Sequence, residues 1–420
     1  MTLAKRLLLG SAAALVATTG AQAADLGLPV APSVDYVQIC SIGSFTGFIL
    51  PGSDVCFDIS GYARWQVTMN QEGNNAVNDD YDMIGQGGLN FDARTMTEFG
   101  LLRGFIGLES AGGAAAGNDT VAFGLEKAFV QVGGLTAGLT DSFFDPAFTG
   151  EALGAIGGMA GDVDHALIAY TAAFGNGFTA TLSLEEDEAR QNGAVSAAVA
   201  TILNGGVAAT AFNMYDESAT MPDIVVSLRV QQAWGEARLN AALHEVDPVT
   251  ATQSSEIGYA IGASAKFNVP FGYTSSIGFM GTYTQGATGY TGIATAAGGV
   301  AMPLIDMTPN LAGTGVNLTT AWVIGAGFEY GITSMLDLEV DGFYGQVDHN
   351  ETGLGIAGLD LDFNTYSVRG SLAYRPVAGL EIRGGVDYVA IDGPSTGAAA
   401  IAPNTDDDMF AARLRITRSF

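Results

Sequence analysis

The feature that most constrains the fold is a series of sixteen segments in which apolar and polar residues alternate. In the first of them, Ile59 and Trp65 share an apolar face, while Arg64 and Gln66 lie on the polar face. A period of two is that of a β-strand whose two faces meet different surroundings. The segments are 57–69, 87–99, 101–110, 120–132, 135–141, 164–174, 178–186, 223–234, 237–244, 257–268, 273–284, 319–330, 335–347, 363–374, 380–391 and 408–420.

The connections between these segments alternate in length. Short ones, such as Gly175-Asn176-Gly177 and Gly235-Glu236, are typical of tight turns. An even number of strands, with tight turns at one end and long loops at the other, is typical of a transmembrane outer-membrane β-barrel. We therefore predict an all-β, sixteen-stranded antiparallel barrel over 57–420. The long connections are 70–86, 111–119, 142–163, 187–222, 245–256, 285–318, 348–362 and 392–407.

The two ends of the chain agree with an exported barrel. Residues 1–23 have the basic start, apolar core and Ala21-Gln22-Ala23 site of a secretory signal peptide, although an amphipathic helix is the alternative. The last segment ends on Phe420, an aromatic on its apolar face. No later run reaches eighteen apolar residues, so we expect no helical span. These features predict a location in the outer membrane of a Gram-negative cell.

The charge balance narrows the possible partners. With 16 basic and 44 acidic residues the net charge is −28, which argues against nucleic acid because phosphate binding needs a basic face. It suits a channel that favours cations, or a surface beside lipopolysaccharide, while simple solubility is the alternative. Two acidic clusters, 79–82 and 406–408, are either solvated or bridged to lipopolysaccharide by divalent cations. The loops 187–222 and 285–318, rich in small residues, are expected to be exposed.

The chain has two cysteines, Cys40 and Cys56, in the segment 24–56 that precedes the barrel. In an oxidising compartment the favoured interpretation is a structural disulfide. A metal site is the alternative, but it would need further ligands, and no histidine is near in sequence.

The polar faces of the strands supply the candidate pore residues. The basic ones come from the first three and last three segments, which become neighbours only when the barrel closes. The acidic ones belong to the third long connection or flank it. The predicted constriction comprises Arg64, Arg94, Arg103, Arg369, Arg383, Arg413 and Arg415 facing Asp141, Asp145, Glu151, Asp162 and Asp164.

Two interpretations of this constriction stay open. Basic and acidic groups facing each other across a narrow gap would create a transverse field that orients dipolar solutes. Alternatively, the arginines pair with inward carboxylates and neutralise the lumen. The candidate carboxylates are Asp58, Asp92, Glu98, Glu109 and Glu381.

Some residues do not fit a simple pattern. Glu126 falls on the apolar face of its segment, so either a bulge redirects it or it lies in a subunit interface. His165, His244 and His349 are scattered over different segments, and none has an evident nucleophile partner. We therefore predict no catalytic residue, no cofactor and no metal site.

Several motifs resemble the alphaproteobacterial general porins of rhizobia and brucellae. They are the paired cysteines within 36–56, the segment 59–64, Leu102-Arg103-Gly104-Phe105, 127–131 and 138–145. The resemblance implies a homotrimer of sixteen-stranded barrels whose third outward loop, here 142–163, folds into the lumen. It implies passive diffusion of small hydrophilic solutes and ions, in contact with outer-membrane lipids and lipopolysaccharide. The alternatives are a solute-selective channel and a structural or adhesive barrel.

Overall fold

The computed structural model describes most of the chain after residue 36. The chain divides into two compact units, 1–38 and 39–420, and the second contains every described strand. The predicted signal peptide, 1–23, lies outside the described residues and stays a prediction. The described ranges are 37–72, 80–113, 123–147, 163–195, 212–215, 221–249, 254–297, 300–309, 315–350, 360–393 and 406–420.

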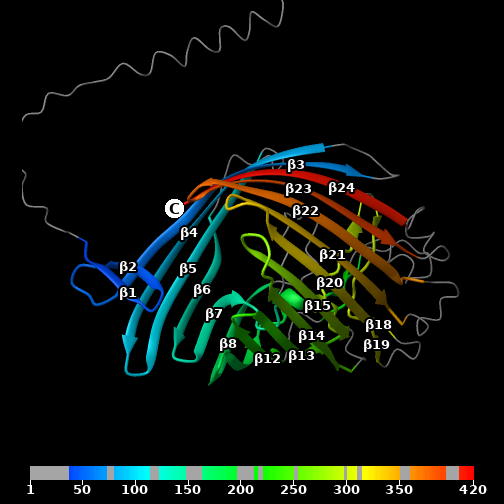
Figure 1. Ribbon diagram of the computed structural model, residues 1–420. Helices are drawn as coiled ribbons and strands as arrows, with labels where there is room; N and C mark the ends of the chain where they lie inside the picture. The colour runs from blue at the N-terminus through cyan, green and yellow to red at the C-terminus, as the bar shows by residue number, and fades with distance from the viewer. Residues whose placement is uncertain are drawn as a thin grey trace, which may run out of the picture. The chain divides into compact units, whose positions relative to one another are not determined.

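Sixteen antiparallel strands form a closed barrel (Figure 1), and the predicted fold class is thereby confirmed. Each strand pairs with the next along the chain, and the last pairs with the first through contacts such as Leu414 opposite Val67. Closure leaves no unpaired sheet edge. The barrel strands are β3 (Cys56–Glu72), β4 (Asp80–Thr97), β5 (Gly100–Gly113), β6 (Gly124–Val132), β7 (Leu135–Asp141), β8 (Asp164–Gly175), β9 (Phe178–Glu185), β12 (Asp223–Gln232), β13 (Gly235–Val246), β14 (Glu256–Asn268), β15 (Ser275–Gln285), β20 (Thr320–Gly331), β21 (Leu336–Asp348), β22 (Phe363–Val377), β23 (Leu380–Asp392) and β24 (Asp406–Ser419).

The remaining described elements are short. A hairpin precedes the barrel, and three small strand pairs and two 3-10 turns lie within the long connections. None of the described helices has the length and hydropathy that a membrane crossing requires. These elements are β1 (Ile39–Ile42), β2 (Phe45–Ile49), η2 (Glu188–Arg190), β10 (Ala194–Val195), β11 (Phe212–Asn213), η3 (Thr288–Tyr290), β16 (Ala296–Ala297), β17 (Val300–Ala301), β18 (Met307–Pro309) and β19 (Val316–Leu318).

The two faces of the wall differ in the way that the alternation predicts. In β12, Val225 and Ser227 are 0% and 6% exposed, whereas Val226 and Leu228 are 42% and 50% exposed. The outward face is therefore apolar and uncovered, and the inward face is enclosed. This inverts the arrangement of a soluble protein and suits a wall that meets lipid outside and polar groups inside.

One end of the barrel is formed by tight turns. Between β8 and β9, Asn176 and Gly177 have φ values of 51° and 78°, as a two-residue hairpin with left-handed central residues requires. A Cβ on Gly177 would lie 1.9 Å from the carbonyl oxygen of Gln231, so glycine is needed there for space as well. We call this end the short-turn end and the opposite one the long-loop end.

Several strands extend further than the alternation indicates, and β4 shows the largest difference because it begins at Asp80 instead of residue 87. The ladder between β3 and β4 continues to Asn70 opposite Asp80, so the first long connection is shorter than the predicted 70–86. Gly85 has low strand propensity and interrupts the alternation in the part of β4 that the sequence did not indicate. In the barrel, the backbone of Gly85 still pairs with Trp65 of β3 on one side and Gly112 of β5 on the other.

Glu126 lies at a bulge. The register between β5 and β6 shifts between Gly107 and Leu108, so Glu126 has no Cα partner on β5. An ideal Cβ on inward-facing Gly107 would lie 3.6 Å from the Glu126 carboxylate, so this side chain reaches the inner side. Of the two interpretations left open, the bulge is confirmed.

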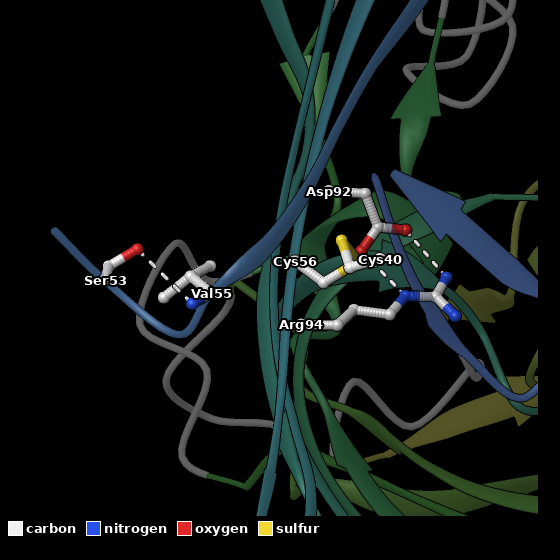
Figure 2. Close-up of a disulfide and its surroundings, with 6 residues drawn as sticks. All are labelled: Cys40, Ser53, Val55, Cys56, Asp92 and Arg94. Atoms are coloured by element: carbon white, nitrogen blue, oxygen red, sulfur yellow. Dashed lines mark hydrogen bonds and ion pairs between the residues drawn. A yellow bond between two sulfur atoms is a disulfide. The ribbon is translucent and has the colours of Figure 1, made fainter. Parts of the chain in front are cut away.

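The cysteines form the predicted disulfide, Cys40–Cys56. It ties β1 to the start of β3, while β2 pairs with β3 at Ile49 opposite Cys56. Figure 2 shows the disulfide beside the ion pair of Arg94 and Asp92. Phe45 of the hairpin lies 4.0 Å from the Arg94 guanidinium, measured to the ring centroid. The hairpin therefore contacts an inward-facing charge near the short-turn end.

Replacing both cysteines, Cys40→Ser/Cys56→Ser, should lower the free energy of unfolding by about 3 kcal/mol if the disulfide acts by restricting the unfolded chain. The hairpin should also open more often, because two short strands hold poorly alone. Hydrogen exchange of the β1 and β2 amides should rise, with exchange in β20 to β22 as the internal control. Unchanged hairpin exchange would mean that its pairing with β3 suffices without the disulfide.

Candidate permeation pathway

The seven predicted arginines all lie on the inward face of six consecutive strands. Closure of the barrel through β24 and β3 makes β22, β23, β24, β3, β4 and β5 neighbours. Across the closing seam, Arg415 faces Gln66 and Arg413 faces Thr68. The structure thus gathers on one stretch of wall side chains that are as much as 351 positions apart in the sequence, from Arg64 to Arg415.

Four of the seven arginines are paired with carboxylates on the same wall. Arg94 and Arg103 share Asp92, with N···O distances of 2.7 and 2.9 Å. Arg369 lies 2.6 Å from Asp341. Two carboxylates thus offset most of the charge of these three arginines, in the direction that the second interpretation of the constriction expects.

Arg383 is the fourth paired arginine. It bonds both Glu339 and Glu381, the latter at 3.0 Å. Glu381 also forms an ion pair with Arg375 at 2.9 Å, so positive and negative charges alternate along this part of the wall.

Of the other three, Arg64 and Arg415 donate hydrogen bonds to neutral side chains, and Arg413 lies beside them on the inward face of β24. Arg415 donates from Nε to Gln66 at 2.8 Å, and Arg64 donates to Gln86 at 3.0 Å. None of the three is in an ion pair with any residue that the structure describes. The inner wall therefore contains a neutralised part and a part with net positive charge.

The described acidic candidates pair with other cations. Asp141 and Asp164 lie 2.5 and 3.6 Å from Lys127. Asp164 shares a face of β8 with exposed Ile168, which is the outward face. Asp145 is buried and lies 3.3 Å from Arg190. None of these contacts involves an arginine of the predicted basic wall.

The first residues of the third long connection lie against the inner wall. The Ala147 amide donates to Ser264 Oγ at 2.8 Å, and the Asn240 side chain donates to the Phe144 carbonyl at 2.7 Å. A Cβ on Gly262 would lie 3.1 Å from the Phe144 ring, so the ring rests directly on the glycine. The rest of this connection, 148–162, lies outside the described residues. It includes two predicted constriction residues, Glu151 and Asp162.

A buried network that the sequence did not indicate lies at the long-loop end. Its centre is Arg190 of η2, whose side chain has no exposed area. Its guanidinium donates to His165 Nε2 at 3.1 Å and to the Gly289 carbonyl at 3.0 Å. It also lies 4.6 Å from the Tyr290 ring centroid. One cation thus joins two long connections to the wall strand β8.

The network continues through a chain of polar side chains to Asp306. Tyr290 donates to Asp223 at 2.5 Å, and the other oxygen of Asp223 lies 2.8 Å from His244 Nδ1. Tyr215 lies 3.1 Å from His244 Nε2 and donates to Asp306 at 2.8 Å. Two of the three histidines, scattered in sequence, therefore belong to one structure.

The two tyrosines of this network remain protonated donors. Burial raises the pKa of Tyr290 well above its ordinary value, and the Asp223 carboxylate adds to this. Burial and Asp306 do the same for the pKa of Tyr215. Both phenols therefore keep the protons that they donate to Asp223 and Asp306 throughout the physiological pH range.

The described parts of the connections 187–222 and 285–318 are less exposed than their composition predicts. Ile305 and Met307 are buried, as are Ile293 and Met302, which pack against Phe343 of the inner wall. Small residues dominate these connections and hide the few large apolar ones that anchor them. A usable signal was present, because Arg190 is the one basic residue of 187–222 and Asp306 the one charged residue of 285–318.

Within the described ranges, no group of three or more His, Cys, Asp or Glu side chains is arranged to hold a metal ion. The polar side chains of the inner wall can form hydrogen bonds with water and with passing solutes.

Comparison with known proteins supports a channel. A sequence model of the Porin subfamily matches residues 28–411. The proteins named Porin Omp2b of Brucella melitensis and Brucella suis are each 29% identical over 300 residues, covering 68% of this chain and 75% of the relative. The outer membrane channel DcaP of Acinetobacter baumannii has a TM-score of 0.65 at 15% identity, covering 89% of this chain and 99% of DcaP. That likeness concerns the fold.

Proposed function

Because this chain belongs to the porin subfamily, we propose that its lumen admits small hydrophilic solutes and ions by passive diffusion, with a preference for cations. The observation that supports the pathway is the closed barrel with an enclosed polar inner face and an exposed apolar outer face. Membership of the family makes the chain an outer-membrane channel and not an enzyme.

The proposed cation preference rests on the charge balance. Acidic residues exceed basic ones by 28, and carboxylates neutralise four of the seven arginines on the basic wall. An excess of negative charge around a pore raises the local concentration of cations. The reversal potential of the open channel in a KCl gradient tests this preference, and a potential of the sign expected for chloride would overturn it.

We also propose that the third long connection, 142–163, narrows the lumen. The support is that its first residues are held on the inner wall of β13 and β14 by Asn240 and Ser264. Residues entering the lumen from that wall reduce its free cross-section. The transverse field between this connection and the arginines stays a proposal, with Asp145, Glu151 and Asp162 as its acidic side, because Asp141 and Asp164 pair with Lys127 and Asp164 faces outward.

A homotrimer in contact with outer-membrane lipids and lipopolysaccharide is the proposed assembly. An apolar groove of about 410 Å³ on the wall from β3 to β7 supports it. Small residues, including Gly104, Ala128 and Ala137, line part of the groove, and phenylalanines, an isoleucine and a valine line the rest. Small side chains allow a neighbouring wall to approach closely. Chemical cross-linking of the purified protein, read as the largest covalent species, tests the number of subunits.

A further inference from the structure

Three arginines at the closing seam of the barrel differ from the other inward-facing arginines. In the part of the chain that the structure describes, each of the others has a carboxylate oxygen within 4.0 Å. Arg64, Arg413 and Arg415 have none. In a chain with so large an excess of carboxylates, three adjacent cations without an ion pair are an unusual arrangement.

The three side chains are close neighbours. Arg413 and Arg415 share the inward face of β24, and Arg64 lies opposite Thr417, diagonal to Arg415. Diagonal neighbours on one face of a sheet lie about 7–8 Å apart, within reach of long side chains. The guanidiniums of Arg64, Arg413 and Arg383 all repel that of Arg415. Asp387 attracts Arg413, but it does not balance three positive charges.

Two guanidinium groups of this cluster are held in place by neighbouring side chains, but not all N–H groups of the cluster have an acceptor within the described ranges. Gln66 and Gln86 each accept one bond, and the Tyr62 ring supports Arg64 with 4.4 Å from guanidinium carbon to ring centroid. The Nε atoms of Arg64 and Arg413 are buried and have no hydrogen-bond partner among the residues that the structure describes. Buried charged donors without acceptors are costly, and an anion that binds the terminal nitrogens of the same guanidiniums offsets that cost through charge-assisted hydrogen bonds.

We propose that Arg64, Arg413 and Arg415 form a binding site for small dianionic solutes whose oxygens accept hydrogen bonds from the guanidiniums. Guanidinium groups suit such solutes because their donors form a planar fork that matches paired oxygens. Dianions passing through the pore would bind at this site, and their flux would saturate. The excess negative charge of the chain as a whole favours cations. This inference rests on the proposed permeation pathway.

Sulfate, which is dianionic throughout the neutral range, is the probe. Single-channel current of the refolded chain is recorded in KCl while sulfate is added on either side of the bilayer. Sulfate should reduce the current in a saturable manner. In Arg413→Gln/Arg415→Gln the half-blocking concentration should rise by about ten-fold or more, since a hydrogen bond to a charged group contributes that much.

Two further variants separate a built site from general attraction. Arg413→Lys/Arg415→Lys keeps the charge but loses the fork, so its half-blocking concentration should also rise. Arg229→Gln removes an inward arginine that is already paired with Glu236 and should leave the sulfate block in place. Equal block in the lysine variant, or an equal loss in Arg229→Gln, would overturn the proposal.

The failure of the site is distinguishable from the failure of the pathway. A chain that conducts KCl but shows no saturable sulfate block has a pore and lacks the site. A folded chain that conducts no KCl contradicts the pathway itself. If the double variants do not fold, Arg64→Gln alone gives the same test, because it removes one donor group from the same cluster.

Discussion

Replacing Arg190 by methionine is expected to destabilise the long-loop end of the barrel by about 3–5 kcal/mol, the cost of removing one partner from a buried ion pair. Arg190 has no exposed side-chain area and joins Asp145, His165 and the Gly289 carbonyl. Without it, the buried Asp145 carboxylate loses the guanidinium of Arg190, and two long connections lose their link to β8. The current through single channels should become noisier because these connections move into and out of the lumen.

The measurements are urea unfolding in lipid vesicles and single-channel current fluctuations. Arg229→Met is the matched control, because its side chain is 39% exposed and its ion pair with Glu236 lies near the opposite end of the barrel. An exposed pair of this kind contributes about 0.2–1 kcal/mol. If both variants lost the same stability, or if Arg190→Met left the current noise unchanged, the anchoring role of the network would be wrong.

The second large effect is expected at Arg94 and Arg103. The double variant Arg94→Ala/Arg103→Ala should increase both the conductance and the cation preference. Both arginines are held on Asp92, which is 7% exposed, and their loss leaves this carboxylate without its two partners. Removal of the side chains also widens the lumen near the short-turn end. The reversal potential in a KCl gradient and the slope conductance report the two effects separately.

A third substitution separates charge from size. Adding Asp92→Asn to the double variant should return the reversal potential toward that of the unchanged protein while the conductance stays high. The triple variant keeps the enlarged lumen and removes the uncompensated charge. An unchanged reversal potential in the double variant would show that these arginines do not influence ion selection.

The strands could be predicted from the sequence because lipid and a polar lumen impose a period of two on each of them. The arginines of the wall were placed on the inward face by the same rule. The resemblance to alphaproteobacterial porins is confirmed by the family match. The ends of β3 and β4 could not be predicted, because backbone pairing continues through glycines such as Gly85 that give no side-chain signal.

The partners of the charged groups were harder to predict. Asp92 and Glu381 were expected to pair with arginines and do so, since they lie two residues away on the same face. Asp341, which pairs with Arg369, lies on another strand, and its position depends on a register that alternation does not specify.

The buried network was beyond sequence reasoning for a different reason. Tyr215 and Asp306 are 91 positions apart, and they meet only because two long connections fold over the same part of the wall. Their residues have no period, so no pattern relates them. The available hint was that Arg190 is the one basic residue of its connection and Asp306 the one charged residue of its own, since a buried charge needs a partner.

The central claim is that the barrel encloses an open, polar, cation-preferring pathway. The most direct test is the single-channel conductance of the refolded protein, without residues 1–23, in a planar bilayer under a KCl gradient. We expect current steps in groups of three and a reversal potential of the sign set by potassium. Correctly folded protein that inserts and yet conducts no current would contradict the account.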